Sequence, residues 1–327
     1  MTSNASNDSG ATSPGHHAAS ASPDGGADGG AGDGGAGSGS SGSPVRISPM
    51  TLRARLQWPV TSNSTPESGP GSPAAASIDI DYLRAGSGPA LLYLHPAGGV
   101  RWTPVLERLA ASRTVYIPVM PGFDGSATQA GIDSMQGLGA LAGAFIDQVI
   151  GARCDVIGQS FGGWVALWLT VQRPECVDHL VLEAPAGFRP EGTQGAPSDP
   201  EALRRALFAH PEKLPPGGKS MEMEAANGRM RAHYNAARAL DHDLLERIGA
   251  IECPTLILHG TEDRVVPRES VQLLKTRMRH AFLVYIWDAA HAIEIDQPER
   301  MLGPTLGFLE RSEGFVANWG TMAVNPD

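Results

Sequence analysis

One serine in the sequence lies where its hydroxyl could become reactive. The stretch 156–164 is VIGQSFGGW, so Ser160 stands between Gly158 and Gly162 with one residue on each side. A short apolar run precedes this stretch and a helix-forming run follows it. Glycine at these positions removes side chains where a sharp strand-to-helix turn brings the backbone together, and a serine on such a turn presents its hydroxyl at the edge of the sheet. The spacing predicts a nucleophilic serine.

A simpler interpretation makes Ser160 only the capping residue at the start of a helix. The two can be distinguished, because a serine hydroxyl becomes a good nucleophile only when a base accepts its proton and an acid orients that base. The nucleophile interpretation requires a carboxylate and then a histidine, each just after a later strand. Asp263 follows a predicted strand at 255–258, and His291 follows one at 282–286. Ser160, Asp263 and His291 are therefore the candidate catalytic residues.

Other side chains compete for these roles. Glu183 ends an earlier predicted strand and is an alternative acid. We expect Glu262 to point away from the site, and Asp288 is badly placed to brace His291 because both lie on one loop. The other histidines are expected to brace loops (His95 and His259) or to be solvated (His179, His210, His233 and His242).

A serine nucleophile also needs N–H donors for the oxygen of its tetrahedral intermediate. The stretch 94–99, LHPAGG, follows a predicted strand and leads toward a helix. Because Pro96 has no N–H, the donor in this loop must be Ala97 or a later residue. We expect the backbone N–H groups of Ala97 and Phe161 to form the oxyanion hole.

The elements that must position these residues alternate along the chain, which predicts an α/β fold with a mostly parallel sheet. The first strands look like a hairpin, so the sheet is expected to be mixed. Strands are predicted at 51–58, 78–83, 90–94, 114–119, 154–157, 179–183, 255–258 and 282–286, and helices at 102–112, 134–150, 161–172, 200–209, 221–240, 269–278 and 298–310.

Composition divides the chain further. Residues 1–44 are almost entirely small and polar, and such a segment buries too little apolar surface to order itself. We predict a disordered tail at 1–44, an α/β core formed by 45–186 and 248–327, and an inserted helical cap at 187–247. The cap is predicted because about 70 residues separate the predicted strands at 179–183 and 255–258, and a structureless loop of that length is uncommon.

Charge and cysteine content limit the partners. The net charge of −10 argues against nucleic acid or an anionic membrane as a partner. No apolar run reaches the roughly 18 residues that cross a bilayer. The cysteines Cys154, Cys176 and Cys253 have no metal-ligand spacing, and buried reduced thiols favour a cytoplasmic location. We expect no cofactor, no metal and a small-molecule substrate, and the oligomeric state is left open.

With these residues assembled, the chain resembles the α/β-hydrolase family from about residue 78 to residue 311. The resemblance rests on HPAGG at 95–99, PVMPGFDGS at 118–126, GQSFGG at 158–163, LHGTEDRVVP at 258–267 and AH at 290–291. It implies an eight-stranded, mostly parallel sheet with helices on both faces and a cap after the sixth strand. It also implies the nucleophile, acid and base roles for Ser160, Asp263 and His291.

Three hypotheses about function follow. The first is a cofactor-independent serine hydrolase of a small, largely apolar ester, lactone or related acyl compound. The second is a hydrolase that uses the same residues to cleave a carbon–carbon bond in a diketone-like acid, because the cap is similar to that of hydrolases acting on ring-cleavage products. Those enzymes commonly have Asn where this chain has Gln159, and the reaction requires a cationic cap residue such as Arg189. The third is a non-catalytic binding protein that kept the fold.

Overall fold

The computed structural model describes residues 46–59, 75–235, 238–318 and 323–324. The predicted disordered tail at 1–44 lies outside the described residues. All the described residues belong to one compact unit, Arg46–Asp327.

Eight strands of the described chain form one mixed sheet in the order β1-β2-β4-β3-β5-β6-β7-β8. β1 and β2 are antiparallel, as are β2 and β4, whereas neighbours from β4 across to β8 are parallel. The predicted mostly parallel sheet with a hairpin at its start is confirmed. The strands are β1 (Met50–Pro59), β2 (Ala75–Ala85), β3 (Ala90–Leu94), β4 (Thr114–Pro118), β5 (Cys154–Gln159), β6 (Val177–Glu183), β7 (Thr255–Gly260) and β8 (Ala281–Ile286), with a separate pair formed by β9 (Ala317–Asn318) and β10 (Ala323–Val324).

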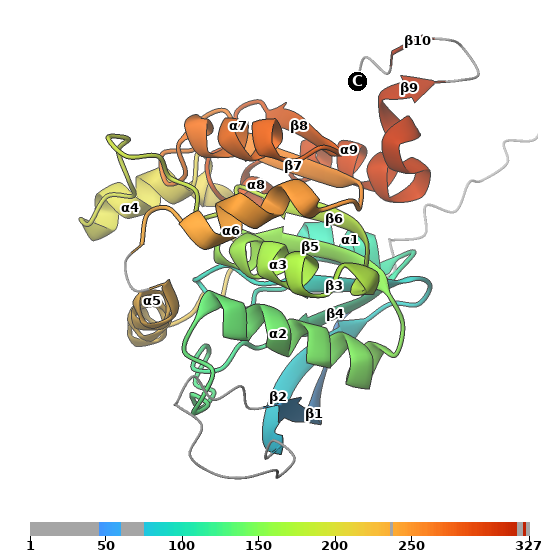
Figure 1. The fold of residues 1–327 in the computed structure, drawn as a ribbon. Helices are drawn as coiled ribbons and strands as arrows, with labels where there is room; N and C mark the ends of the chain where they lie inside the picture. The colour runs from blue at the N-terminus through green and yellow to red at the C-terminus, as the bar shows by residue number, and fades with distance from the viewer. Residues whose placement is uncertain (1–45, 60–74, 236–237, 319–322, 325–327) are drawn as a thin grey trace, which may run out of the picture. The chain divides into compact units, whose positions relative to one another are not determined.

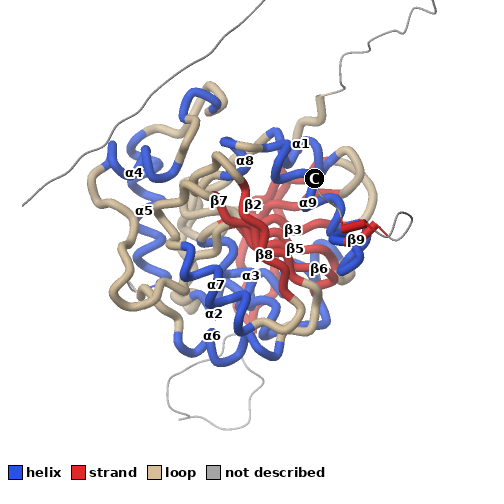
Figure 2. The backbone as a smooth tube through the Cα atoms, turned by 90° about the horizontal axis from the view of Figure 1, so that it is seen from above, coloured by secondary structure: helices blue, strands red, loops and turns tan. Residues whose placement is uncertain are grey.

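Helices cover both faces of the sheet (Figure 2). α2, α3, α6 and α7 contribute to one apolar cluster, and α1 and α9 contribute to a second cluster on the opposite face. Burial of these apolar faces is the main force that stabilises the layers. The helices are α1 (Pro104–Ala110), α2 (Met135–Phe145), α3 (Phe161–Gln172), α4 (Pro200–Leu207), α5 (Met221–Asn235), α6 (His242–Arg247), α7 (Arg268–Arg277), α8 (Ile293–Asp296) and α9 (Pro298–Arg311).

The segment between β6 and β7 is helical, as predicted, and α4 and α5 lie to one side of the sheet (Figure 1). Both helices end earlier than the sequence predicts. α4 ends at Leu207 because the N–H of Ala209 donates to the Asp296 side chain at 3.0 Å. Leu240 pairs in a β-bridge with Phe188 and is therefore not part of α5.

Other helices also differ from the prediction by a few residues, for reasons that lie in their own local structure. The helix predicted at 102–112 begins at Pro104, because the side chain of Thr103 caps it by accepting from the Leu106 N–H at 3.3 Å. The helix predicted at 134–150 becomes a π-helical turn over Ile146–Ile150. α6 and α8 were not predicted as separate helices.

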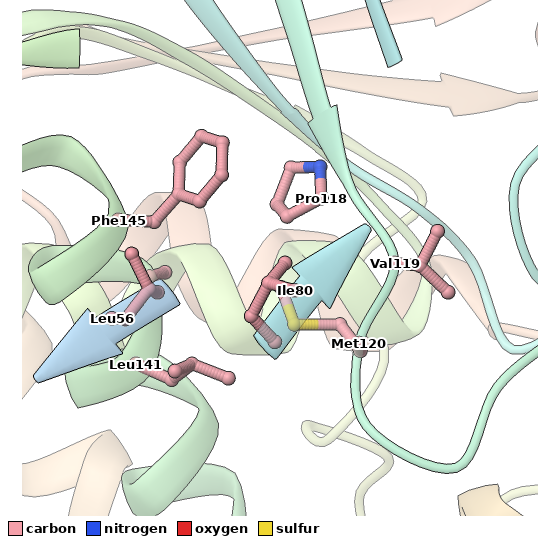
Figure 3. Close-up of a pocket in the computed structure, with 8 residues that line it drawn as sticks. Leu56, Ile80, Pro118, Val119, Met120, Leu141 and Phe145 are labelled. Atoms are coloured by element: carbon pink, nitrogen blue, oxygen red, sulfur yellow. The ribbon is translucent and has the colours of Figure 1, made fainter. Parts of the chain in front are cut away.

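A narrow gap remains in the core between α2 and the strands β1, β2 and β4 (Figure 3). It has no room for a water molecule. Its lining is entirely apolar, so it is a packing gap and not a ligand site. The lining residues are Leu56, Ile80, Pro118, Val119, Met120, Leu141, Ala142 and Phe145.

Candidate active site

Ser160 occupies the turn between β5 and α3, as the glycine spacing predicts. Its backbone has φ 52° and ψ −110°, a conformation that is strained for a residue with a Cβ atom. The turn is held because the Ser160 N–H donates to the Glu183 carbonyl at 2.8 Å and the Ser160 carbonyl accepts from the Ala186 N–H at 3.0 Å. The Ser160 side chain makes no capping hydrogen bond to α3. The interpretation of Ser160 as only a helix cap is therefore wrong.

Two glycines make this sharp turn sterically possible. A Cβ atom at Gly162 would lie 1.9 Å from the carbonyl oxygen of Leu94, and one at Gly158 would lie 2.5 Å from the carbonyl oxygen of Gly162. Both distances are far shorter than a van der Waals contact. The close approach of Gly162 to Leu94 also brings the start of α3 beside the end of β3.

The His291 ring lies between Ser160 and Asp263. Its Nε2 is 2.8 Å from Ser160 Oγ, and its Nδ1 is 2.9 Å from Asp263 Oδ2. Ser160 is 9% exposed, His291 is 5% exposed, and the Asp263 side chain is fully buried. The structure thus brings together the three side chains selected from the sequence, at distances suited to proton transfer between hydroxyl and imidazole.

The Asp263 carboxylate is fixed by its own loop. Its Oδ1 accepts from the Val265 N–H at 2.8 Å and from the Val266 N–H at 3.0 Å. Burial by itself raises the pKa of Asp263, but the charge and hydrogen bond of His291, with smaller contributions from His259 and Val266, hold the pKa below its usual value. An ionised Asp263 favours the His291 tautomer with its proton on Nδ1, which leaves Nε2 free to accept from Ser160.

The competing acids lie in other hydrogen-bond networks. The Glu183 side chain is buried below the turn and lies 3.0 Å from the Gln159 amide. Asp288 Oδ2 is 2.9 Å from His210 Nε2, so His210 is paired and not simply solvated as predicted. Glu262 is exposed, as expected.

The competing histidines support the scaffold. His259 Nε2 bonds the Val266 carbonyl at 3.0 Å and braces the loop that carries Asp263, as expected. His179 was predicted to be solvated, but it lies on β6 and its Nδ1 is 2.8 Å from Asp155 Oδ1. Partial burial beside Phe308 explains the difference.

The two predicted oxyanion donors lie on adjacent elements. Phe161 is the first residue of α3, where N–H groups have no acceptor within the helix. Ala97 lies in the loop that follows β3. The approach of Leu94 to Gly162 joins these two elements, and the roles of Ala97 and Phe161 stay a prediction.

A polar cluster around Asp124 holds the loop after β3. Asp124 Oδ2 accepts from the Val100 N–H at 2.7 Å, and the Asn227 side chain, from α5, donates to the Gly98 carbonyl at 2.9 Å. Asn227 also donates to Asp124 Oδ1 at 2.8 Å, and Lys219 pairs with the same oxygen. Burial alone raises the pKa of Asp124, but the bonds from Lys219, Asn227 and Val100 bring it below its usual value. The segment between β6 and β7 is therefore bonded directly to the predicted oxyanion loop.

A second contact joins the same segment to the His291 loop. The buried Asp296 carboxylate accepts from the N–H groups of Ala209 at 3.0 Å and His210 at 2.8 Å. It also accepts from the Ala290 N–H at 2.8 Å. Lys213 Nζ donates to the Asp296 carbonyl at 2.6 Å. One carboxylate thus fixes the position of the helical segment relative to the residue before His291.

The residues that make these two contacts were not among the candidates selected from the sequence. Asp124 lies inside the PGFDGS stretch that supports the family resemblance, so it could have been selected as polar and near the site. Asn227 lies in an ordinary helical pattern, and Asp296 lies between a predicted strand and a predicted helix. Nothing in their spacing indicates that their side chains are buried.

His95 braces the loop from below. Its Nε2 accepts from the Met120 N–H at 3.1 Å and its Nδ1 lies 2.8 Å from the Pro96 carbonyl. Its ring is fully buried, and this burial lowers the pKa of His95 from 6.5 to about 4. A neutral ring with its proton on Nδ1 satisfies both bonds.

This pKa predicts a loss of stability in acid. Between about pH 6.5 and about pH 4 the unfolded chain binds a proton at His95 that the folded chain does not, so the free energy of unfolding falls as the pH falls through this window. The full shift corresponds to about 3 kcal/mol. His95→Gln keeps an acceptor for Met120 but cannot titrate, so we expect its stability to fall less between pH 7 and about pH 4.5, measured by urea unfolding. His242→Gln, at an exposed position, is the control; equal pH dependence in His95→Gln and the wild type would contradict the assignment.

Two negative findings concern the described part of the chain. No group of His, Cys, Asp and Glu side chains there is arranged to hold a metal ion. No helix there is long and apolar enough to cross a membrane.

The comparisons with known proteins identify the family. A family model described as the alpha/beta hydrolase family matches residues 91–303. The chain belongs to the alpha/beta hydrolase family. The resemblance seen in the sequence motifs is therefore confirmed, and the family accounts for the mixed eight-stranded sheet.

Relatives in the alpha/beta hydrolase family are hydrolases and esterases by name. The chain is 28% identical over 270 residues to a 2-hydroxymuconate semialdehyde hydrolase from Pseudomonas sp. (strain CF600), covering 73% of this chain and 93% of that protein. It is 27% identical over 250 residues to a pimeloyl-[acyl-carrier protein] methyl ester esterase from Aeromonas salmonicida, and the match covers 69% of this chain and 97% of that protein. Among solved structures, the 2-hydroxy-6-oxo-6-phenylhexa-2,4-dienoate hydrolase from Rhodococcus sp. strain RHA1 superposes with a TM-score of 0.59 at 20% identity, covering 80% of this chain and all (100%) of that one.

Proposed function

We propose that this alpha/beta hydrolase is a serine hydrolase that cleaves a small, largely apolar ester, lactone or related acyl substrate through an acyl-enzyme. The observation that carries the proposal is the continuous hydrogen-bonded path from Ser160 Oγ through the His291 ring to Asp263, with distances of 2.8 Å and 2.9 Å. The similarity to an esterase named for a methyl ester supports an ester substrate.

The mechanism follows from the geometry. Ser160 Oγ attacks the substrate carbonyl carbon while His291 Nε2 accepts the hydroxyl proton, and Asp263 stabilises the imidazolium that forms. The N–H groups of Ala97 and Phe161 bind the oxygen of the tetrahedral intermediate. His291 returns the proton to the leaving group, and water then attacks the acyl-enzyme with His291 as base. His291 passes this proton to Ser160 Oγ as the bond to the acyl group breaks and the carboxylic acid leaves. No cofactor enters any step.

The helical segment 187–247 acts as the cap in this proposal, over the core formed by 45–186 and 248–327. The bonds from Asn227 to Gly98 and from Ala209 to Asp296 support it, since they attach the segment to the loops on both sides of Ser160. Such a cap shapes the substrate pocket and excludes water during the reaction.

A second candidate is the hydrolysis of a carbon–carbon bond in a diketone-like acid with the same three residues. The similarity to the 2-hydroxymuconate semialdehyde hydrolase favours it. Two features favour the ester instead: the residue before Ser160 is Gln159, and the Arg189 guanidinium, the cation expected to meet a substrate carboxylate, donates to the Thr193 carbonyl at 2.9 Å.

The two candidates are separated by a substrate panel. We expect chromogenic p-nitrophenyl esters of increasing acyl chain length, together with lactones, to be hydrolysed with a higher kcat/KM than a chromogenic vinylogous diketone acid. Ser160→Ala is the matched blank for each substrate. Faster turnover of the diketone acid would establish the second candidate in place of the first, and no turnover of any substrate would support a non-catalytic binding protein.

A further inference from the structure

Two buried glutamates lie beneath the Ser160 turn, and the proposed mechanism does not use their side chains. Glu183 ends β6 and is 0% exposed, and Glu294 lies on α8 and is 1% exposed. Two ionised carboxylates at such depth would repel each other and lose their hydration. The hydrogen bonds around the two carboxyl groups therefore determine which of them carries a proton.

A chain of three contacts joins the two carboxyl groups. The Gln159 amide lies 3.0 Å from Glu183 Oε1 on one side and 3.1 Å from the Tyr93 hydroxyl on the other. The Tyr93 hydroxyl is also in hydrogen-bond contact with Glu294 Oε1. The order is thus Glu183, Gln159, Tyr93 and Glu294.

Counting protons along this chain shows that one is missing. The amide of Gln159 can donate to only one of its two neighbours, because its other end is a carbonyl oxygen. Tyr93 has a single hydroxyl proton, and burial together with the charge of Glu294 raises its pKa, so that it keeps this proton. Three contacts therefore share two donors, and the third proton must belong to a carboxyl group. With the amide NH₂ facing Glu183 and its carbonyl facing Tyr93, that carboxyl group is Glu294. With the amide turned end for end it is Glu183, whose Oε1 donates to the Gln159 carbonyl oxygen, while the amide NH₂ donates to Tyr93 and Tyr93 donates to Glu294.

The surroundings of the two carboxyl groups place that proton on Glu183, and therefore turn the Gln159 carbonyl toward Glu183. Both Glu294 oxygens face hydroxyl groups, since Oε2 accepts from Thr103 Oγ1 at 2.6 Å and Oε1 contacts Tyr93. In contrast, Glu183 Oε2 is buried without a hydrogen-bond partner, which costs less for a neutral acid than for a carboxylate. Burial raises the pKa of both groups. The charge of Glu294 and a hydrogen bond to it raise the pKa of Glu183 further, whereas the bonds from Thr103, Tyr93 and Glu183 partly offset the effect of burial on the pKa of Glu294. The arrangement is a neutral Glu183 and an ionised Glu294.

The chain also connects the two halves of the candidate active site. Gln159 directly precedes Ser160, and the backbone carbonyl of Glu183 accepts from the Ser160 N–H at 2.8 Å. Glu294 lies three residues after His291, and its backbone N–H donates to Glu183 Oε1 at 3.3 Å. The Ser160 turn and the His291 loop thus meet at Glu183.

We propose that Glu183 and Glu294 share one proton through Gln159 and Tyr93, and that Glu183 is a positioning residue that holds the Ser160 turn against the His291 loop. The positioning role rests on the proposed function, whereas the shared proton does not. The two parts are tested by separate measurements.

The proton is tested by infrared difference spectroscopy of the full chain at neutral pH. We expect a C=O stretching band of a buried protonated carboxyl group in the wild type that disappears in Glu183→Gln. Glu310→Gln, an exposed glutamate on α9, is the control and should keep the band. Absence of the band in the wild type, or its persistence in folded Glu183→Gln, would overturn the shared proton whatever the enzyme does.

The positioning role is tested by kinetics. Glu183→Gln can donate where the acid did, so we expect a kcat within about two-fold of wild type. Glu183→Leu removes the connection, and we expect a roughly ten- to hundred-fold lower kcat with KM nearly unchanged, because a small misplacement of reacting groups has effects of this size. If Glu183→Leu does not fold, Tyr93→Phe breaks the same chain at one hydroxyl and should lower kcat with the same pattern. The positioning role would be contradicted if a folded Glu183→Leu or Tyr93→Phe variant had the kcat of the wild type. It would also be contradicted if Glu183→Gln and Glu183→Leu lost kcat equally.

Discussion

Ser160→Ala is expected to lower kcat by about 10⁶, to the residual rate that substrate binding and the oxyanion donors support by themselves. The effect is large because the variant removes the atom that forms the acyl-enzyme, and the 2.8 Å hydrogen bond to His291 disappears with it. The measurement is the initial rate with the best ester of the panel at saturating concentration. We expect the fold to remain, because the backbone bonds of the turn do not involve the hydroxyl.

The control for this variant is Ser112→Ala, which removes a serine hydroxyl from an exposed position after α1. Its kcat should equal that of the wild type. A Ser160→Ala variant with more than a few per cent of wild-type kcat would mean that the reaction does not pass through an acyl-enzyme on this residue.

Asp263→Asn is expected to lower kcat by about 10⁴, the size of effect seen when a base histidine is held in the wrong tautomer. The asparagine carbonyl oxygen takes the place of Oδ1, where it still accepts from the N–H groups of Val265 and Val266. The amide NH₂ then faces His291 Nδ1, and the ring proton moves to Nε2. In that tautomer His291 cannot accept the Ser160 proton.

The neighbouring Glu262 provides the matched control, because it is exposed and one residue away. Glu262→Gln should retain wild-type kcat. If Asp263→Asn also retained it, or if Glu183→Gln showed the larger loss, the acid would have to be assigned to Glu183 at the end of β6.

The sequence predicted the parts of this site that depend on local backbone geometry. A serine between glycines needs a sharp turn, and Gly162 does lie where any Cβ atom would meet the Leu94 carbonyl. Asp263 and His291 could be found because parallel strands end at one edge of the sheet, so that loops distant in sequence meet there. The hairpin-like first strands, followed by strands that alternate with helices, were also sufficient to predict the mixed sheet.

The contacts of the helical segment could not be predicted in the same way. α4 ends two residues early because Asp296, far along the chain, accepts the Ala209 N–H, and helical periodicity contains no information about such a partner. The protonation of Glu183 depends on Tyr93 and Glu294, which come from β3 and α8. In the sequence Glu183 is only a carboxylate at a strand end, which makes it an alternative acid there.

The most direct test of the central claim, that Ser160 is the nucleophile activated by His291, is labelling of the full chain with a fluorophosphonate followed by peptide mapping in a mass spectrometer. The account predicts one covalent adduct, on Ser160, which forms rapidly in the wild type, much more slowly in Asp263→Asn and not at all in Ser160→Ala. An unlabelled wild-type protein, or an adduct that forms at another residue in both wild type and Ser160→Ala, would contradict it.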